Sequence, residues 1–255
     1  CSAAGAFVVR LKLSSLGFAM SHAAFAGAAL GLWIGLVDPV WTALLFALVA
    51  AAALGPLADL SRLEVDSILG GVFPLTMALG LIFIHQVSGP GFGGALSLLW
   101  GSVLGITWGE VTVLAGTALA LAVIMLGWRH GFLALLLDRK LAEASGFATR
   151  RYFYTVLFLT ALVVSVSLRI SGGLVIYALT VLPATAALQW VYDVRKVFIV
   201  AMAIGVSAAV GGFALSLGAD LPIGSSIAVC AAGVFLVSLA LSPKRRRGVA
   251  RCHEA

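Results

Sequence analysis

Residues 15–36, SLGFAMSHAAFAGAALGLWIGL, form an apolar run in which His22 is the only residue with an ionisable side chain. A helix needs about 20 apolar residues to cross the hydrocarbon core of a bilayer, so this run predicts a membrane-spanning helix. Further apolar runs of similar length lie at 40–57, 67–87, 110–128, 153–168, 174–190, 197–217 and 222–241. The repeated pattern predicts a bundle of transmembrane helices.

The composition indicates that lipid is the main solvent of the chain. It is 62% hydrophobic and only 10% charged, with a mean hydropathy of +1.14, whereas soluble domains are about half apolar and a quarter charged. A membrane β-barrel would show segments of about ten residues in which apolar and polar side chains alternate. We therefore predict an all-α, polytopic membrane helix bundle with about eight complete transmembrane helices, preceded by a truncated first helix over residues 1–9.

The basic residues predict the orientation of the bundle. Cytoplasmic loops of membrane proteins carry an excess of Lys and Arg, and residues 244–247 read Lys-Arg-Arg-Arg. With the tail, 244–255, in the cytoplasm, alternation of the helices places every other Lys and Arg inside except Arg169. The short apolar stretch 95–106 then stays on the outer side as a re-entrant or interfacial helix. Residues 1–243 are predicted to form one membrane domain.

Several activities lack their sequence signatures. The chain has no G-x-x-x-x-G-K-[ST] motif for ATP phosphates, no H-E-x-x-H zinc site and no G-x-S-x-G nucleophile. Residues 89–94 match G-x-G-x-x-G, but they follow an apolar span and lack the strand-to-helix context of a dinucleotide site. The net charge of +6 comes from loop and tail residues, so it indicates topology and not nucleic-acid binding. We predict neither an enzyme nor a resident cofactor.

His22 is the most informative residue for function. An ionisable side chain within a membrane span is costly, so it is expected to face the bundle interior, a cavity or a partner chain. Ser21 lies beside it, and Phe18 lies one helical turn earlier on the same face. We predict that His22 either lines a transport path as a ligand or is a core histidine bonded to a neighbouring carbonyl.

Residues 138–146, DRKLAEASG, form a charged segment between two spans. Asp138 suits the start of a helix, and Gly146 suits the left-handed residue that ends one. The segment is predicted to be a short cytoplasmic helix, either a docking helix for a partner or an ordinary connector. The residues that would serve such docking, besides the two ends, are Leu141, Ala142 and Glu143.

Pro183 lies inside the predicted span 174–190. Proline removes a backbone hydrogen bond and kinks a helix, and interrupted helices often line the substrate path of transporters. We predict that Pro183 either borders a translocation path or is a structural kink.

Six separated patterns occur in a fixed order along the chain: SHAAFAGAALG, Glu64-Val-Asp66 before a Gly-containing span, LLWGSVLGI, DRKLAEASG, GGLVIYALTVLPATAA and DLPIGSSIAV. Together they resemble the permease subunits of ABC-type metal-uptake systems for zinc, manganese or iron, over nearly the whole chain. The resemblance implies a multi-pass protein of a prokaryotic plasma (inner) membrane, paired with a second permease copy. It also implies a cytoplasmic ABC ATPase dimer that binds ATP, an extracytoplasmic metal-binding protein, and residues 138–146 as the coupling helix.

The resemblance further implies a metal-coordinating pair, an Asp followed four residues later by a His. His22 matches the His, but Phe18 stands at the Asp position and cannot coordinate a cation. Three explanations stay open. His22 from two protomers suffices for a divalent metal that favours imidazole, with Zn²⁺ preferred over Mn²⁺ or Fe²⁺; another residue substitutes for the Asp; or the cargo is a chelate or another non-metal molecule. An ATPase-independent transporter or scaffold is disfavoured, because the acidic residues cluster at the ends of spans.

Overall fold

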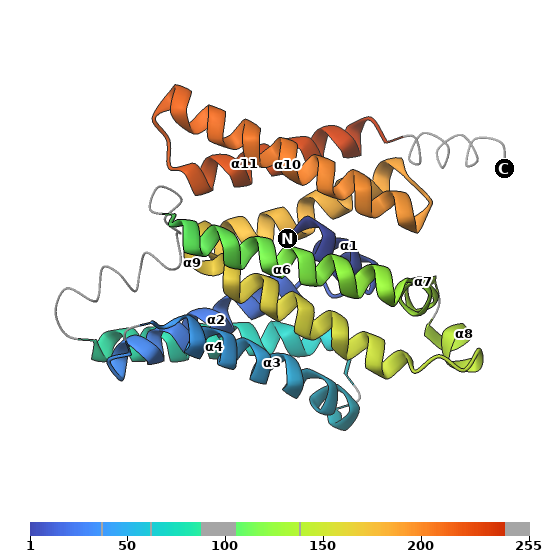
Figure 1. The fold of residues 1–255 in the computed structure, drawn as a ribbon, viewed down its shortest axis with the longest axis horizontal. Helices are drawn as coiled ribbons and strands as arrows, with labels where there is room; N and C mark the ends of the chain where they lie inside the picture. The colour runs from blue at the N-terminus through green and yellow to red at the C-terminus, as the bar shows by residue number, and fades with distance from the viewer. Residues whose placement is uncertain (37, 62, 88–105, 138, 243–255) are drawn as a thin grey trace.

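The computed structural model describes residues 1–36, 38–61, 63–87, 106–137 and 139–242 (Figure 1). Within these ranges the secondary structure is helical. The helices are α1 Ser2–Arg10, α2 Leu16–Trp33, α3 Val40–Ser61, α4 Val65–Gln86, α6 Trp108–Gly127, α7 Arg129–Leu137, α8 Arg139–Ala144, α9 Thr149–Trp190, α10 Val194–Ala219 and α11 Ile223–Ala240.

The longest helix, α9, consists of two arms. Gly172 has φ 73° and ψ 158°, which is far from helical geometry and which a residue with a Cβ rarely adopts. The chain reverses there, so the first arm, Thr149–Leu168, and the second arm, Ile170–Trp190, each form a separate span. Figure 1 shows the two arms running back towards the same end of the molecule.

Eight helical segments among the described residues are long and apolar enough to cross a membrane. They confirm the predicted all-α bundle and its eight spans, and α1 is the short helix expected before them. The predicted outer stretch 95–106 and the basic tail 244–255 lie outside the described residues. The sequence analysis did not predict α7 as a helix; its apolar residues Phe132, Leu135 and Leu136 are buried against the bundle.

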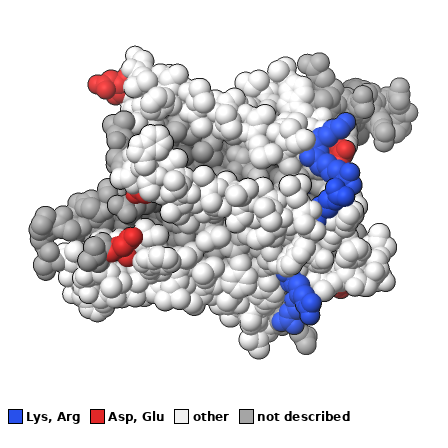
Figure 2. All heavy atoms as spheres, in the orientation of Figure 1, with Lys and Arg blue, Asp and Glu red and all other residues white. Residues whose placement is uncertain are grey.

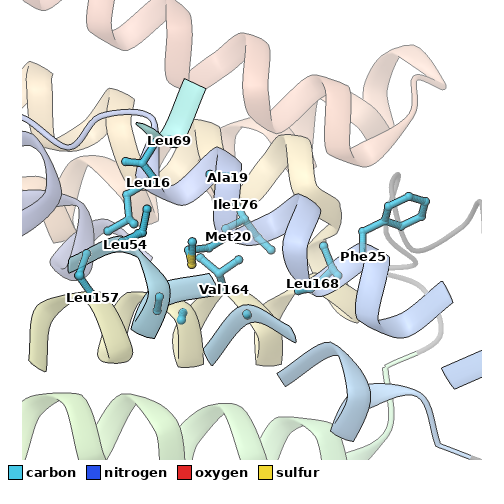
Figure 3. Packing of buried hydrophobic residues seen from close by; sticks show 14 of the residues in the cluster. Leu16, Ala19, Met20, Phe25, Leu54, Leu69, Leu157, Val164, Leu168 and Ile176 are labelled. Carbon is cyan, nitrogen blue, oxygen red and sulfur yellow. The ribbon is translucent and has the colours of Figure 1, made fainter. Parts of the chain in front are cut away.

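The core is built around α2, of which 78% is buried, the highest share of any span. Figure 3 shows Leu16 and Met20 of α2 among side chains from three other helices. Small residues allow these helices to approach closely. A Cβ added at Gly27 would lie 2.3 Å from the backbone oxygen of Thr42 in α3, and one added at Gly80 of α4 would lie 2.6 Å from the ring of Phe25. The core residues labelled from the other helices are Leu54, Leu69, Leu157, Val164, Leu168 and Ile176.

One end of the bundle, called the basic end here, gathers basic residues. A cluster of Phe7, Phe132, Val156 and Val194 joins the end of α1, α7 and the starts of α9 and α10 at this end. Figure 2 shows the visible Lys and Arg side chains there, with acidic side chains mostly at the opposite, distal end. This distribution agrees with the alternation predicted from the sequence. The basic residues in or beside the end of α1, in α7 and at the starts of α9 and α10 are Arg10, Lys12, Arg129, Arg150, Arg151, Arg195 and Lys196.

Candidate translocation site

The α2 helix places Phe18, Ser21 and His22 on one face, because residues three and four apart are neighbours on a helix. His22 is only 8% exposed. Its Nδ1 atom lies 2.9 Å from the backbone oxygen of Phe18, and the Ser21 hydroxyl donates to the same oxygen at 2.8 Å. The Ser21 oxygen is also 3.3 Å from Nδ1. The imidazole is therefore held in one orientation by its own helix.

These contacts define which nitrogen of His22 is available for a ligand. A carbonyl oxygen can only accept a hydrogen bond, so the 2.9 Å contact requires the proton on Nδ1. In the neutral imidazole the other nitrogen, Nε2, then carries a free lone pair. A histidine that ligates a metal through one nitrogen commonly donates its other N–H to a carbonyl in this way. Of the two alternatives for His22, the bond to a neighbouring carbonyl is present, and a ligand role in a transport path stays a prediction.

Aromatic rings from three helices gather at this imidazole and its neighbour Phe18. The Phe18 ring centroid lies 4.5 Å from that of His22, and Phe73 of α4 lies 4.7 Å from His22 and 4.5 Å from Phe18. The ring centroid of Tyr177, in the second arm of α9, lies 5.2 Å from that of Phe18. Tyr177 contacts Phe18 and not the His22 ring. All three aromatic residues are half-buried. We call these four residues the aromatic site.

Contacts of α2 with α4 and with the second arm of α9 fix the position of the aromatic site. The Ser15 N–H donates to Asp66 Oδ1 at 3.2 Å, which holds the start of α2 beside the start of α4. On the other side, the second arm of α9 packs on α2 through glycine. A Cβ at Gly173 would lie 3.4 Å from the Ser21 hydroxyl, and one at Gly17 would lie 3.6 Å from Thr180. Phe18 and His22 are thus enclosed by α4 and α9.

A single chain offers little for a complete metal site here. Phe18 supplies a ring where a carboxylate was expected, so His22 Nε2 is the one nitrogen ligand of the aromatic site. No group of three or more His, Cys, Asp or Glu residues that could hold a metal occurs among the residues described. A bare divalent cation in one copy of this site would meet one neutral imidazole and several π faces.

Pro183 lies apart from the aromatic site. It is buried in the second arm of α9, and its ring lies 3.7 Å from the position that a Cβ on Gly205 of α10 would take. Proline cannot donate to the carbonyl four residues earlier, which belongs to Leu179. The Ser2 hydroxyl of α1 donates to that carbonyl at 2.8 Å. Ser2 thus takes the place of the missing donor. Both alternatives for Pro183, a structural kink and a border of a translocation path, stay predictions.

The predicted docking segment forms a short helix that ends as expected. Gly146 has φ 83°; its N–H donates to the Glu143 carbonyl at 3.0 Å, and the next N–H, of Phe147, donates to the Ala142 carbonyl at 3.1 Å. This is the glycine-terminated pattern of a Schellman motif. Asp138, the predicted start, lies outside the described residues.

The two apolar residues of α8 have opposite environments. Ala142 is 3% exposed and packs against its own chain, whereas Leu141 is 66% exposed. A carboxylate oxygen of Glu143 accepts a hydrogen bond from the Thr149 hydroxyl at 2.5 Å, which ties the helix to the first turn of α9. Of the docking residues predicted from sequence, Leu141 and Glu143 are both exposed, and Leu141 is the apolar one.

Sequence reasoning missed Phe73, Tyr177 and Thr149. The first two are ordinary aromatic residues of apolar runs, and nothing in their spacing shows that their helices meet at His22. Thr149 follows the left-handed Gly146 and begins a span, so its position at a helix start was the available signal.

Comparison with known proteins identifies the family. Residues 1–242 match the ABC 3 transport family. The chain belongs to that family. This ABC 3 chain is 24% identical to the high-affinity zinc uptake system membrane protein ZnuB of Buchnera aphidicola, over 92% of this chain and 89% of that protein. It is 26% identical to the manganese transport system membrane protein MntC of Halalkalibacterium halodurans, over 96% of this chain and 83% of that protein.

A solved structure shows the same fold. PsaBC from Streptococcus pneumoniae in complex with Fab contains a chain that superposes on this ABC 3 chain with a TM-score of 0.84. The two are 28% identical, over 96% of this chain and 87% of that one. These comparisons confirm the resemblance to permease subunits of ABC-type uptake systems that the six sequence patterns indicated. They leave the roles of the individual site residues as predictions.

Proposed function

We propose that this protein is the membrane-spanning permease of an ATP-driven importer for a divalent metal ion, with Zn²⁺ as the favoured cargo and Mn²⁺ or Fe²⁺ as alternatives. The observation that carries the proposal is the orientation of His22, a buried imidazole inside a span with Nδ1 tied to the Phe18 carbonyl and Nε2 available. Family membership and the names of the related zinc and manganese transport proteins support metal as the cargo.

Two copies of the chain would complete the site. One chain brings one Nε2 to the aromatic site, so a homodimer whose axis passes beside α2 would bring two. Imidazole suits Zn²⁺ better than it suits Mn²⁺, which prefers carboxylate and carbonyl oxygen. A site with His22 from each copy and no carboxylate in place of Phe18 therefore favours Zn²⁺.

ATP would be hydrolysed by a partner, because the chain has no phosphate-binding motif of its own. We propose an ABC ATPase dimer at the basic end and an extracytoplasmic binding protein at the distal end. The exposed Leu141 of α8 would enter a groove on the ATPase, and the Glu143–Thr149 hydrogen bond would pass the movement to α9. This arrangement places the tail 244–255 in the cytoplasm and the bundle in the inner membrane.

A chelated metal is the second candidate cargo. Phe18, Phe73 and Tyr177 present half-buried rings around His22. Flat aromatic faces suit an organic ligand better than a bare cation, which needs lone pairs from several donors. In this case His22 would bind an open position on a metal that keeps its own organic ligand.

Transport by the permease–ATPase complex in proteoliposomes tests the proposal. With the binding protein present, we expect ATP-dependent uptake of ⁶⁵Zn²⁺ that exceeds uptake of Mn²⁺. His22→Ala should reduce Zn²⁺ uptake at least tenfold, because it removes the nitrogen ligand. His85→Ala, which removes an exposed imidazole from the last turn of α4, is the matched control and should retain uptake. Uptake unchanged in His22→Ala would remove the site assignment, and uptake of a Zn²⁺ chelate in preference to free Zn²⁺ would establish the second cargo.

A further inference from the structure

Tyr177 carries the only side-chain hydroxyl among the three aromatic residues around His22. Its ring contacts Phe18, and Phe18 in turn contacts His22, with centroid distances of 5.2 Å and 4.5 Å. The Phe18 ring is thus in contact with both an imidazole and a phenol. The resemblance to the metal-uptake permeases implies a carboxylate at the position of Phe18, so both polar residues contact the side chain that stands where an oxygen donor is missing.

The Tyr177 hydroxyl has no hydrogen-bond partner within the part of the chain that the structure describes. By contrast, threonine hydroxyls in the same spans donate hydrogen bonds to carbonyls of their own helix. Thr160 donates to the Val156 carbonyl at 2.8 Å and Thr180 to the Ile176 carbonyl at 2.6 Å, each one turn earlier in its own helix. A tyrosine cannot do this, because its ring holds the hydroxyl away from its own backbone. Its partner has to come from outside the helix.

Tyr177 is the eighth residue of the 21-residue second arm, Ile170–Trp190, so it lies away from the ends of the span, where a tyrosine hydroxyl would meet water and headgroups. It lies between Gly173 and Thr180 in the second arm of α9. Those two residues pack against Ser21 and Gly17 of α2, so Tyr177 lies at the depth of the aromatic site. A hydroxyl inside a span that lacks a protein partner is costly unless it lines a wet path or meets a ligand.

We propose that the Tyr177 hydroxyl is the oxygen donor of the cargo site, taking the place of the carboxylate that Phe18 cannot supply. A phenol oxygen offers lone pairs to a cation and a proton to an acceptor. It binds the metal ion directly or through a water of its coordination shell, while His22 Nε2 supplies the nitrogen ligand of the same ion. This inference rests on the proposed function, because it assigns a second ligand to the same divalent cation.

The clean test is Tyr177→Phe, which removes the hydroxyl and keeps the ring that packs on Phe18. Zn²⁺ binding to the nucleotide-free permease–ATPase complex in nanodiscs is measured by calorimetry, together with the KM and Vmax of uptake. We expect the Kd and KM for Zn²⁺ to rise about tenfold, since a hydrogen bond to a charged group is strong. The melting temperature of the complex should stay unchanged.

Tyr154→Phe is the matched control. Tyr154 is also half-buried, but it lies in the second turn of α9 at the basic end, where its hydroxyl lies against Gly55 and Arg150 lies over its ring. The Kd for Zn²⁺ should be unaffected by this change. A rise in Kd equal to that of Tyr177→Phe would show that any tyrosine hydroxyl matters non-specifically and would overturn the assignment.

A rescue experiment separates a ligand from a packing residue. Phe18→Asp in the Tyr177→Phe background restores an oxygen beside His22 and should return the Kd for Zn²⁺ towards the wild-type value. Phe18→Asn, which offers an amide oxygen without a buried charge, is the second variant if the aspartate prevents folding. Failure of both folded variants to restore binding would mean that Tyr177 acts through packing.

The outcomes also separate this inference from the proposed function. If His22→Ala loses Zn²⁺ binding while Tyr177→Phe binds as well as the wild type, the metal function stands and the Tyr177 assignment is wrong. If neither change affects Zn²⁺ binding, both the cation site and the Tyr177 assignment fall. Weaker binding in both variants, with rescue at Phe18, supports the two together.

Discussion

Helices α2 and α6 are both apolar membrane spans, yet they lie at opposite extremes of burial: 78% of α2 is buried and only 6% of α6. The buried span is the less hydrophobic one, with a mean hydropathy of 1.3 against 2.0. Lipid tails are as apolar as leucine, so hydropathy does not drive a helix inward in a bilayer; close packing does. The Ala- and Gly-rich α2 is at the centre because its neighbours can approach it, and α6 presents Val and Leu outward.

Glycine substitutions in the two spans give the largest expected difference. A Cβ at Gly27 of α2 would lie 2.3 Å from the Thr42 carbonyl oxygen, whereas at Gly116 of α6 nothing lies within 4 Å. Gly27→Leu should destabilise the bundle by about 3 kcal/mol or more, as overpacking does. Gly116→Leu should change the melting temperature of the detergent-solubilised protein very little. Equal melting temperatures would show that backbone contact does not place α2 at the centre.

Removing a hydroxyl group should also destabilise the buried part of the bundle more than α6, but by a smaller free energy than the glycine substitutions. Ser2 donates at 2.8 Å to the Leu179 carbonyl that Pro183 leaves without a helical donor, whereas Thr117 of α6 donates to the Val113 carbonyl of its own helix. Ser2→Ala should lower the free energy of unfolding by about 1–2 kcal/mol, because an interior carbonyl loses its partner. Thr117→Ala should cost less than about 0.5 kcal/mol.

Two further variants, Pro183→Ala with and without Ser2→Ala, show which contact of Ser2 stabilises the bundle. Pro183→Ala restores the backbone N–H, so Ser2→Ala should cost less in that background than in the wild type. An undiminished cost would assign the loss to packing against Gly205, where a Cβ would lie 2.0 Å from the Ser2 hydroxyl. Either result shows how α1 is held against the second arm of α9.

The sequence predicted the spans well because length and continuous apolarity decide whether a helix crosses a bilayer. It also predicted that His22 would be buried in the bundle and that Gly146 would end α8, since an ionisable residue within a span and a glycine after a helix are local features of the sequence. The burial order of the spans was not predictable from hydropathy, as α2 and α6 show. Phe73 reaches His22 through the packing of α4 on α2, and Tyr177 reaches Phe18 through the reversal at Gly172 and the packing at Gly173. Both are tertiary features.

Pro183 shows a different limit of sequence reasoning. A proline within a span indicates an interrupted hydrogen-bond ladder, but it does not say what fills the gap. Here the donor is the hydroxyl of Ser2, which lies 181 positions before Pro183 in the sequence. A carbonyl that a proline leaves without a donor can bond to a side chain or can line a translocation path. The neighbouring helices decide between these two, and the sequence pattern does not show them.

Substitutions of the N-cap residues should have the smallest effect, and here α6 should be destabilised more than α2. Thr107 caps α6: its hydroxyl accepts from the Glu110 N–H at 3.4 Å, and Glu110 Oε2 accepts from the Thr107 N–H at 2.8 Å. The N-cap residue of α2, Ser15, makes no side-chain cap bond. Thr107→Ala should cost about 1 kcal/mol, seen as faster hydrogen exchange in the first turn of α6, while Ser15→Ala should leave exchange in α2 unchanged.

The reason for this reversal is that α6 has little tertiary packing to hold its first turn, so local bonds matter more there than in α2. Two alternative results would weaken the argument. Faster exchange in α2 after Ser15→Ala would mean that its packing does not make the cap dispensable. Unchanged exchange in α6 after Thr107→Ala would mean that another surface, such as a second copy of the chain, already covers this helix in the membrane.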